Sequence, residues 1–230
     1  MKIDLVEIAG LTTRVVGPAD ATLTVVLLHG FGAPGDDLVS LGEYMGVPAR
    51  YVFPEAPIEL GGLYGDSRAW WRLDLAALEA DMRAGSVRDR RTEVPDGLAP
   101  ARDQLNRFLD QLKIRYAIED RQLVLGGFSQ GAMLSLDVAL HRETPPAALI
   151  LMSGTLLAES EWGPRMATLA KVPVMQSHGR NDQLLPFAVA EILRDKLKAA
   201  GAVVDFQQFV GGHEIPPAVL AAAAKLLRSV

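Results

Sequence analysis

The chain of 230 residues contains no cysteine. This absence excludes disulfide bonds, thiolate ligands for a metal, a cysteine nucleophile and anchoring through a palmitoylated cysteine. A nucleophile, if the protein has one, must be another residue. An excess of positive charge is also missing, because the formal net charge is −5 and the pI is about 5.4. Binding to nucleic acid or to an anionic membrane is therefore not expected.

Long apolar runs are absent as well. No stretch of the sequence is long enough and apolar enough to cross a bilayer. The first apolar stretch, within residues 1–7, contains acidic residues and does not have the basic-then-apolar layout of a signal peptide. We therefore expect a cytoplasmic protein without integral membrane association. No internal repeat, low-complexity tract or linker divides the sequence, so we predict one domain over residues 1–230.

Short β-branched and apolar runs alternate with longer helical segments along the chain. This alternation predicts an α/β fold with a mostly parallel central sheet and helices on both faces, because parallel strands need crossover helices. The alternating pattern from Ile3 to Val16, interrupted by Ala9 and Gly10, indicates an antiparallel hairpin at the sheet edge. The predicted strands cover residues 24–28, 50–53, 123–125, 148–152, 172–176 and 203–209, and the predicted helices cover residues 36–45, 99–116, 130–141, 187–200 and 216–228.

Between about residues 55 and 100 the regular pattern breaks. A long excursion of this kind on an α/β scaffold usually overlies the active site. The aromatic residues Tyr64, Trp70 and Trp71 are therefore candidates for the wall of a substrate pocket. For the two tryptophans a place in the core is equally consistent with the sequence, which does not distinguish between them.

The most informative motif is Gly127-Phe128-Ser129-Gln130-Gly131, which lies between an apolar run and a helical stretch. A serine in a sharp strand-to-helix turn needs small residues on both sides, because the backbone folds back on itself there. The G-x-S-x-G pattern alone also occurs by chance, and an ordinary tight turn is the alternative. The place of the motif between strand and helix favours a nucleophile elbow with Ser129 as the nucleophile.

A serine nucleophile needs a histidine to take its proton and a carboxylate to orient that histidine. In α/β-hydrolases the partners follow the chain order serine, acid, histidine, on loops at the carboxyl ends of strands. Only His213 follows a strand and has an acid-bearing strand end, at Asp182, between it and Ser129. His141 lies in a helical stretch and is expected at the surface. The alternatives are His29 and His178 for the base, and Glu159, Glu161 and Asp205 for the acid.

Acyl transfer also requires hydrogen-bond donors for the developing oxyanion. One expected donor is the backbone amide of Gln130, which follows the nucleophile and begins a helix. The second is expected from the loop His29-Gly30-Phe31-Gly32, whose glycines let the backbone turn its amides inward. A plain turn at the end of the strand is the alternative for this loop.

Seven short motifs are spread over nearly the whole chain. They are His29 to Gly32, Phe53 to Pro57, Trp71 to Asp74, Gly127 to Gly131, Ser153-Gly154, His178 to Asp182 and Gly212 to Pro216. Together they resemble the phospholipase/carboxylesterase family, which includes the acyl-protein thioesterases. The resemblance implies an α/β-hydrolase fold, no cofactor and no metal. It also implies a catalytic triad of Ser129, Asp182 and His213, with oxyanion donors at the amides of Phe31 and Gln130.

The sequence departs from the family pattern at two places. Phe31-Gly32-Ala33-Pro34 stands where members often have Leu-Gly-Asp or a similar triplet, and Trp71-Arg72-Leu73-Asp74 is a stretched form of a Trp-Phe-Asp motif. Both changes lie at the rim of the acyl pocket, so they affect substrate choice and leave the reaction class unchanged. We expect a serine carboxylesterase for short- to medium-chain acyl esters of small molecules. The alternatives are an acyl-protein thioesterase or lysophospholipase, and a non-catalytic binding protein. The sequence does not determine the oligomeric state and is compatible with a dimer.

Overall fold

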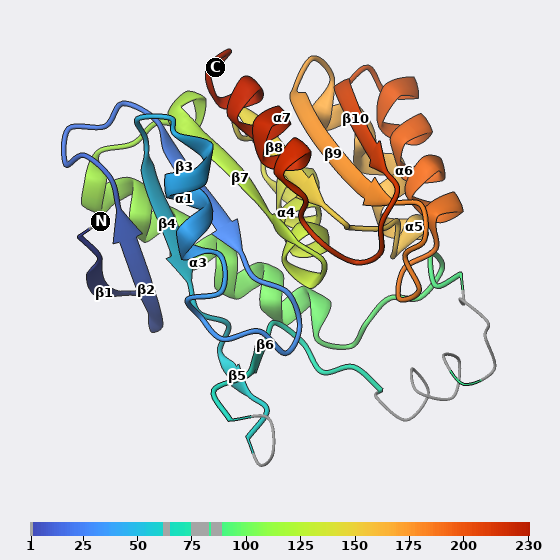
Figure 1. Ribbon diagram of the computed structural model, residues 1–230, viewed down its shortest axis with the longest axis horizontal. Coiled ribbons are helices and arrows are strands. Elements are labelled where there is room, and N and C mark those ends of the chain that lie inside the picture. The colour runs from blue at the N-terminus through green and yellow to red at the C-terminus, as the bar shows by residue number, and fades with distance from the viewer. Residues whose placement is uncertain (1, 62–64, 75–82, 84–88) are drawn as a thin grey trace.

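The computed structural model describes residues 2–61, 65–74, 83 and 89–230. Within these ranges, eight strands form one sheet in the order β1-β2-β4-β3-β7-β8-β9-β10 (Figure 1). Strands β4 to β10 of this order are parallel, whereas β1 pairs with β2, and β2 with β4, in antiparallel fashion. The predicted mostly parallel sheet with an antiparallel hairpin at one edge is confirmed. The strands are β1 (Asp4–Ile8), β2 (Leu11–Val16), β3 (Thr24–Leu28), β4 (Arg50–Pro54), β7 (Leu123–Phe128), β8 (Ala148–Met152), β9 (Pro173–Gly179) and β10 (Val203–Phe209).

The burial of each strand follows from its position in the sheet. All residues of β3, β4 and β8 are buried, because these inner strands are covered on both faces and read as continuous apolar runs. Strand β10 lies at the other edge, pairs only with β9 and is partly exposed, with Val203 62% exposed. The near-continuous hydrophobicity of the inner strands therefore does not extend to this edge.

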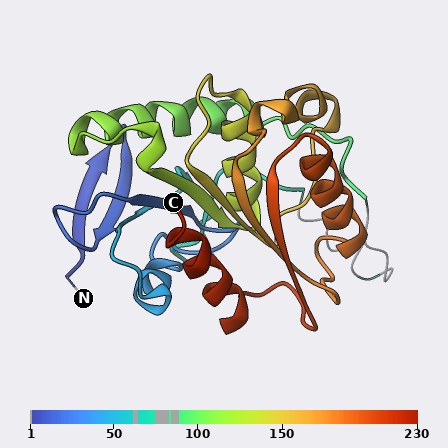
Figure 2. The same cartoon turned by 90° about the horizontal axis from the view of Figure 1, so that it is seen from above.

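The longer helices cover the two faces of the sheet (Figure 2). Helices α1 and α7 contribute to the core on one face, and α3, α4 and α6 contribute to the core on the other. The predicted helix at 36–45 begins only at Val39, because Asp36 to Leu38 form hydrogen-bonded turns; the other predicted helices end within one residue of their predicted bounds. None of the helices in the described part of the chain is both long and apolar enough to cross a membrane. The helices are α1 (Val39–Met45), α3 (Leu98–Tyr116), α4 (Gln130–His141), α5 (Glu159–Trp162), α6 (Phe187–Ala199) and α7 (Pro217–Leu227), with 3₁₀ helices η2 (Asp120–Gln122) and η3 (Gly163–Leu169).

The excursion after β4 contains a small hairpin that the sequence pattern did not predict. Strands β5 (Ile58–Glu59) and β6 (Arg68–Ala69) pair in antiparallel fashion, apart from the main sheet. Arg68 contacts Glu55 at 2.9 Å, and Glu55 also contacts Arg14 of β2 at 3.0 Å. These ion pairs attach the hairpin to the end of the central sheet, next to the loop that follows β3.

A buried ion-pair cluster joins three helices on one face of the sheet. Asp137 of α4 is fully buried, and Arg102 of α3 donates to both of its carboxylate oxygens, at 2.6 and 3.0 Å. The same guanidinium donates to Glu161 of α5 at 3.2 Å, and the indole of Trp162 donates to Asp137 at 2.8 Å. His141 Nδ1 lies 2.8 Å from the Asp137 carbonyl oxygen, so this nitrogen carries a proton. The side chain of His141 is half-buried, so its predicted position at the surface is wrong.

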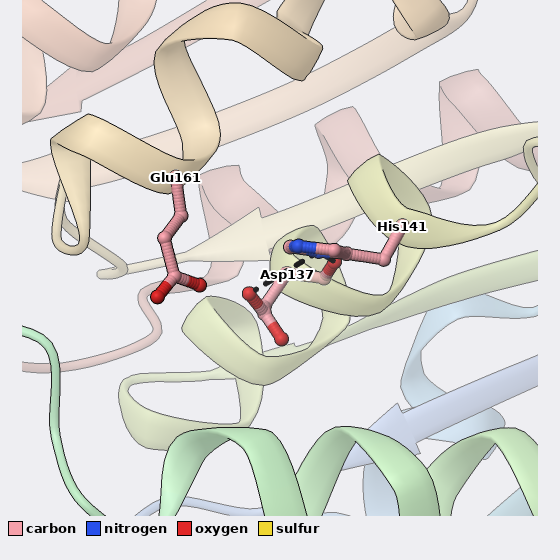
Figure 3. A group of neighbouring side chains, drawn as sticks. All are labelled: Asp137, His141 and Glu161. Carbon is pink, nitrogen blue, oxygen red and sulfur yellow. Dashed lines mark hydrogen bonds and ion pairs between the residues drawn. The ribbon is translucent and has the colours of Figure 1, made fainter.

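The side chains of Asp137, His141 and Glu161 approach one another as the ligands of a metal ion would (Figure 3). The surrounding contacts argue against that reading. The guanidinium of Arg102 already pairs with both carboxylates, and the nearest nitrogen of His141 is a hydrogen-bond donor and so not a ligand. We interpret the cluster as a structural ion pair that ties α3 and α5 to the helix following the predicted nucleophile.

Replacement of Asp137 by asparagine is expected to lower the free energy of unfolding by about 3 kcal/mol, because it leaves a guanidinium half-buried without its full partner. Urea unfolding measures this difference. Asp103→Asn, which changes an exposed carboxyl on the same helix as Arg102, is the matched control and should stay within about 0.5 kcal/mol of the wild type. An Asp137→Asn protein as stable as the wild type, or an unfolding midpoint that rises when a divalent cation is added, would contradict the ion-pair interpretation.

Candidate active site

Loops that follow the carboxyl ends of β3, β7, β8, β9 and β10 surround a cavity of about 490 Å³. Ser129 and His213, the predicted nucleophile and base, both line this cavity. The described part of the excursion supplies another section of the wall. The lining residues from that excursion are Trp71, Leu73, Asp74, Arg90, Glu93 and Pro95.

Ser129 occupies a sharp turn between β7 and α4. Its φ of 53° and ψ of −117° lie in a region that side-chain-bearing residues rarely adopt. A Cβ on Gly127 or on Gly131 would collide with the carbonyl oxygen of Leu28 at the end of β3, so both positions require glycine. The turn is fixed by a hydrogen bond from the Ser129 amide to the Met152 carbonyl at 2.9 Å. The predicted strand-turn-helix context of the motif is therefore present, and it brings Ser129 to the cavity.

Asp182 and His213 are brought together from the loops after β9 and β10. His213 Nδ1 lies 2.7 Å from Asp182 Oδ2, and Asp182 Oδ1 accepts hydrogen bonds from the amides of Leu184 and Leu185 at 2.9 Å. The imidazole of His213 also packs against the ring of Phe128, with centroids 4.7 Å apart. The hydroxyl of Ser129 makes no hydrogen bond within the described residues, so the link from serine to imidazole is open in this conformation.

The environment of Asp182 keeps its carboxyl ionised. Burial alone would raise its pKa, but hydrogen bonds from His178, His213 and the amide of Leu185 outweigh burial and hold the pKa well below its usual range. An acid that stays charged at all working pH values is suited to orienting an imidazole and stabilising its protonated form.

His178 makes a contact that the sequence did not reveal. It is fully buried, does not line the cavity, and its Nε2 lies 3.3 Å from Asp182 Oδ2 and 3.0 Å from the carbonyl oxygen of Leu185. Both neighbours are hydrogen-bond acceptors, so Nε2 carries a proton and can donate it to the Asp182 carboxylate. The position of His178 four residues before Asp182, at the end of the same strand, was the available signal.

Two amides of the loop after β3 are already hydrogen-bonded within the protein. Gly32 N donates to the Arg68 carbonyl at 2.9 Å, and Ala33 N donates to the Gly30 carbonyl at 3.4 Å. Among the residues that the structure describes, the amides of Phe31 and Gln130 have no hydrogen-bond acceptor. Phe31 and Gln130 both line the cavity, as expected for residues predicted to supply the oxyanion donors.

His29 holds this loop rather than facing the cavity. Its Nε2 accepts a hydrogen bond from the amide of Ala56 at 3.1 Å, which makes Nδ1 the protonated nitrogen, and Nδ1 donates to the Gly30 carbonyl at 2.8 Å. Burial lowers the pKa of His29, so the ring stays neutral. The competing acids also lie away from the cavity. Glu159 pairs with Arg91 and Lys196, Glu161 pairs with Arg102, and Asp205 accepts from Gln207 on the edge strand.

The two adjacent tryptophans have different places. Trp71 lines the cavity, whereas Trp70 does not and is buried in the core, where its indole nitrogen donates to the carbonyl of His29 at 3.0 Å. The prediction that Trp70 lines the pocket is therefore wrong. In an irregular segment the sequence gives no periodicity from which to tell the two apart. Tyr64, the third aromatic candidate, lies outside the described residues.

Comparisons with known proteins agree with this fold. A model of the Phospholipase/Carboxylesterase family matches residues 12–230. Acyl-protein thioesterase 1 of Neurospora crassa is 28% identical over 202 residues, which are 84% of this chain and 80% of that protein. The chain resembles the crystal structure of esterase PE8, with a TM-score of 0.81, 30% identity and coverage of 96% of this chain and 99% of that one. The carboxylesterase from Mesorhizobium loti shares the fold, with a TM-score of 0.77, 19% identity and coverage of 99% of both chains.

The parallel sheet with a serine elbow at its carboxyl edge defines an α/β-hydrolase. Since the family model covers nearly the whole sequence, the chain belongs to the phospholipase/carboxylesterase family, a family of ester hydrolases. The resemblance inferred from the seven short motifs is confirmed.

The low pKa of Asp182 predicts a pH-dependent contribution to stability. The folded state gains stability from this carboxyl above its unfolded-state pKa of about 3.9 and loses the gain as the pH falls toward the folded-state pKa. The difference in unfolding free energy between the wild type and Asp182→Asn should therefore shrink as the pH is lowered below about 4. Urea unfolding from pH 6 to pH 2 measures it, with Asp20→Asn, at an exposed turn, as the control. A difference that stays constant down to pH 2 would contradict the placement of two histidines on this carboxylate.

Proposed function

We propose that this protein is a serine carboxylesterase that hydrolyses short- to medium-chain acyl esters of small molecules through an acyl-enzyme on Ser129. One observation carries the proposal: His213, hydrogen-bonded to the buried carboxylate of Asp182 at 2.7 Å, lines the same cavity as the elbow serine. Family membership supports the same reaction class. A nucleophile, a base and an orienting acid together are what acyl transfer needs from side chains.

In this proposal His213 is the general base. Its Nδ1 faces a carboxylate, which only accepts hydrogen bonds, so Nδ1 carries the proton and Nε2 is left as the acceptor. The Ser129 hydroxyl gives its proton to Nε2 as Oγ forms a bond to the ester carbonyl carbon, and Asp182 stabilises the resulting imidazolium. Such hydrogen bonds are often long before substrate binds and shorten in the complex, which is consistent with the open link between serine and imidazole.

The carbonyl oxygen of the substrate then becomes an oxyanion that accepts hydrogen bonds from the amides of Phe31 and Gln130. Gln130 begins α4, so the positive end of the helix dipole adds to the stabilisation. The ester C–O bond breaks and the alcohol leaves with the proton from His213. A water molecule, deprotonated by His213, attacks the acyl-enzyme, and Ser129 regains its proton as the acid departs. One ester and one water thus give one acid and one alcohol.

The composition of the cavity wall supports binding of an apolar acyl group. Besides Trp71 and Phe31, the wall contains the apolar side chains of Met133, Leu157 and Leu185. Each methylene that such a surface buries contributes about 0.8 kcal/mol, until the chain exceeds the available space.

A thioester or a lysophospholipid is the second candidate for the substrate. An acyl-protein thioesterase is among the relatives, and the same serine, base and donors would serve a thioester carbonyl. A binding protein without turnover is a third reading. The nucleophile, the base and the candidate oxyanion donors line one cavity, and Asp182 is hydrogen-bonded to the base, which favours an enzyme.

Replacement of Ser129 by alanine is expected to lower ester hydrolysis by at least about 1,000-fold, because the residual rate comes only from substrate binding and oxyanion stabilisation. Hydrolysis of p-nitrophenyl butyrate measures the loss, and a fluorophosphonate probe should label the wild type and not the variant. Ser160→Ala, which changes an exposed serine of α5, is the matched control and should keep full activity. Retention of more than about a tenth of wild-type turnover by Ser129→Ala would make the elbow assignment wrong.

His213→Ala should lose activity about as completely as Ser129→Ala, and Asp182→Ala less severely, because the acid orients the base and does not itself transfer the proton. His141→Gln, at the far end of α4, is the control and should turn over normally even if its stability falls. If His213→Ala kept most of the wild-type kcat while remaining folded, another residue would have to be the base.

The acyl-chain preference is expected to rise over the first few carbons and then fall, with the best kcat/KM at about four to eight carbons. A series of p-nitrophenyl esters from acetate to palmitate measures this profile. Trp71→Ala removes a wall of the cavity and should move the optimum to longer chains, whereas Trp70→Phe, which keeps a ring in the core, should leave the optimum in place. A steady rise to palmitate in the wild type would favour the thioester or lipid substrate instead.

A further inference from the structure

The side chain of Gln130 holds the segment that carries the two tryptophans. Gln130 is 1% exposed, and its Oε1 accepts a hydrogen bond from the amide of Trp70 at 2.9 Å while its Nε2 donates to the carbonyl of Trp71, also at 2.9 Å. One planar amide therefore satisfies a main-chain donor and a main-chain acceptor, as a neighbouring strand would. Aspartate, glutamate, serine or an apolar residue could not supply both partners at this reach.

The same segment is bound on its other side to the loop after β3. Gly32 N donates to the Arg68 carbonyl at 2.9 Å, and Arg68 N donates to the Ala33 carbonyl at 3.1 Å. The indole of Trp70 donates to the carbonyl of His29 at 3.0 Å. These bonds lie on both sides of Phe31 in the loop, so the position of the Phe31 amide depends on the position of residues 68–71.

We infer that the Gln130 side chain is a positioning residue that fixes the distance between the two halves of the oxyanion hole. The inference rests on the proposed function, in which the amides of Gln130 and Phe31 are the two donors. The first amide belongs to Gln130 itself, and the side chain of the same residue determines, through residues 68–71, where the second amide lies. Donors placed in advance at the oxyanion stabilise the transition state without reorganisation, and small displacements weaken that effect strongly.

A merely structural role of the Gln130 side chain would have different consequences. If Gln130 only supported Trp71 as a cavity wall, its loss would change KM and the chain-length preference. If it positions the Phe31 amide, its loss lowers kcat for every chain length and weakens the binding of ligands that carry an oxyanion. The amide of residue 130 itself remains in any substitution, so the first donor is retained in the test.

The test uses Gln130→Met, which keeps the volume and removes both hydrogen bonds. We expect kcat/KM for p-nitrophenyl butyrate to fall by about 10- to 100-fold, mainly in kcat. An alkyl trifluoromethyl ketone, which forms a tetrahedral oxyanion on the serine, should lose affinity by a similar factor, whereas the matching methyl ketone should not. Gln104→Met, which removes a glutamine bond to the Ala9 carbonyl in the turn between β1 and β2, is the matched control and should leave these kinetic values unchanged.

Trp70→Phe gives an independent measurement, because it removes the indole bond to the His29 carbonyl and keeps the ring. It should show the same selective loss of trifluoromethyl ketone affinity, and the double variant with Gln130→Met should lose less than the product of the two single losses, since both act through one segment.

The inference is overturned if Gln130→Met keeps kcat within about twofold, or loses affinity for both ketones equally. It is also overturned if Gln130→Met does not fold and Trp70→Phe shows no selective loss. Ser129→Ala separates the two levels: activity in that variant contradicts the proposed function, whereas an inactive Ser129→Ala beside a fully active Gln130→Met contradicts only the positioning role.

Discussion

The close approach of the elbow to the end of β3 is the constraint on which the site depends. Gly127 and Gly131 pack against the carbonyl oxygen of Leu28 with no room for a Cβ, so β7, the turn and α4 can fold directly beside β3. The residues that follow Leu28 form the loop that contains Phe31, which therefore begins next to Ser129. A positive φ at a residue with a side chain costs of order 1–3 kcal/mol. Nearly every residue of α4 is buried, and this packing offsets the cost of the strained turn.

Much of the fold and part of the site could be predicted from the sequence, because they depend on local patterns. Buried parallel strands read as short apolar runs, and helical periodicity located most helices to within one residue. The elbow motif was readable because its steric requirement falls on five consecutive residues. Ser129, Asp182 and His213 could be selected because the carboxyl ends of parallel strands meet at one edge, which places their loops together whatever their separation in sequence.

What the sequence did not predict depends on contacts between segments without periodicity. Trp70 and Trp71 are neighbours in an irregular stretch, and only the bonds of that stretch to Gln130 and to the β3 loop determine which ring faces the cavity. The contact of His178 with Asp182 depends on how the loop after β9 turns back over its own strand. His141 was expected at the surface because its helix pattern gave no sign of the buried pair formed by Arg102 and Asp137.

The hydrogen bonds between residues 68–71 and the loop after β3 also limit how the family's specificity can diversify in this chain. Trp71, which lines the cavity, belongs to the same short segment as Arg68, whose main chain is hydrogen-bonded to Gly32 and Ala33. A substitution of Trp71 that admits a bulkier acyl group is expected to shift the segment that holds the loop as well. Because that shift would slow the reaction, selection would act against the substitution. Leu73 and Pro95, farther along the excursion, line the same cavity, and within the described part of the chain neither is hydrogen-bonded to that loop. Substitutions that adapt the protein to new substrates are therefore expected at those positions, whereas residues 68–71 should change slowly.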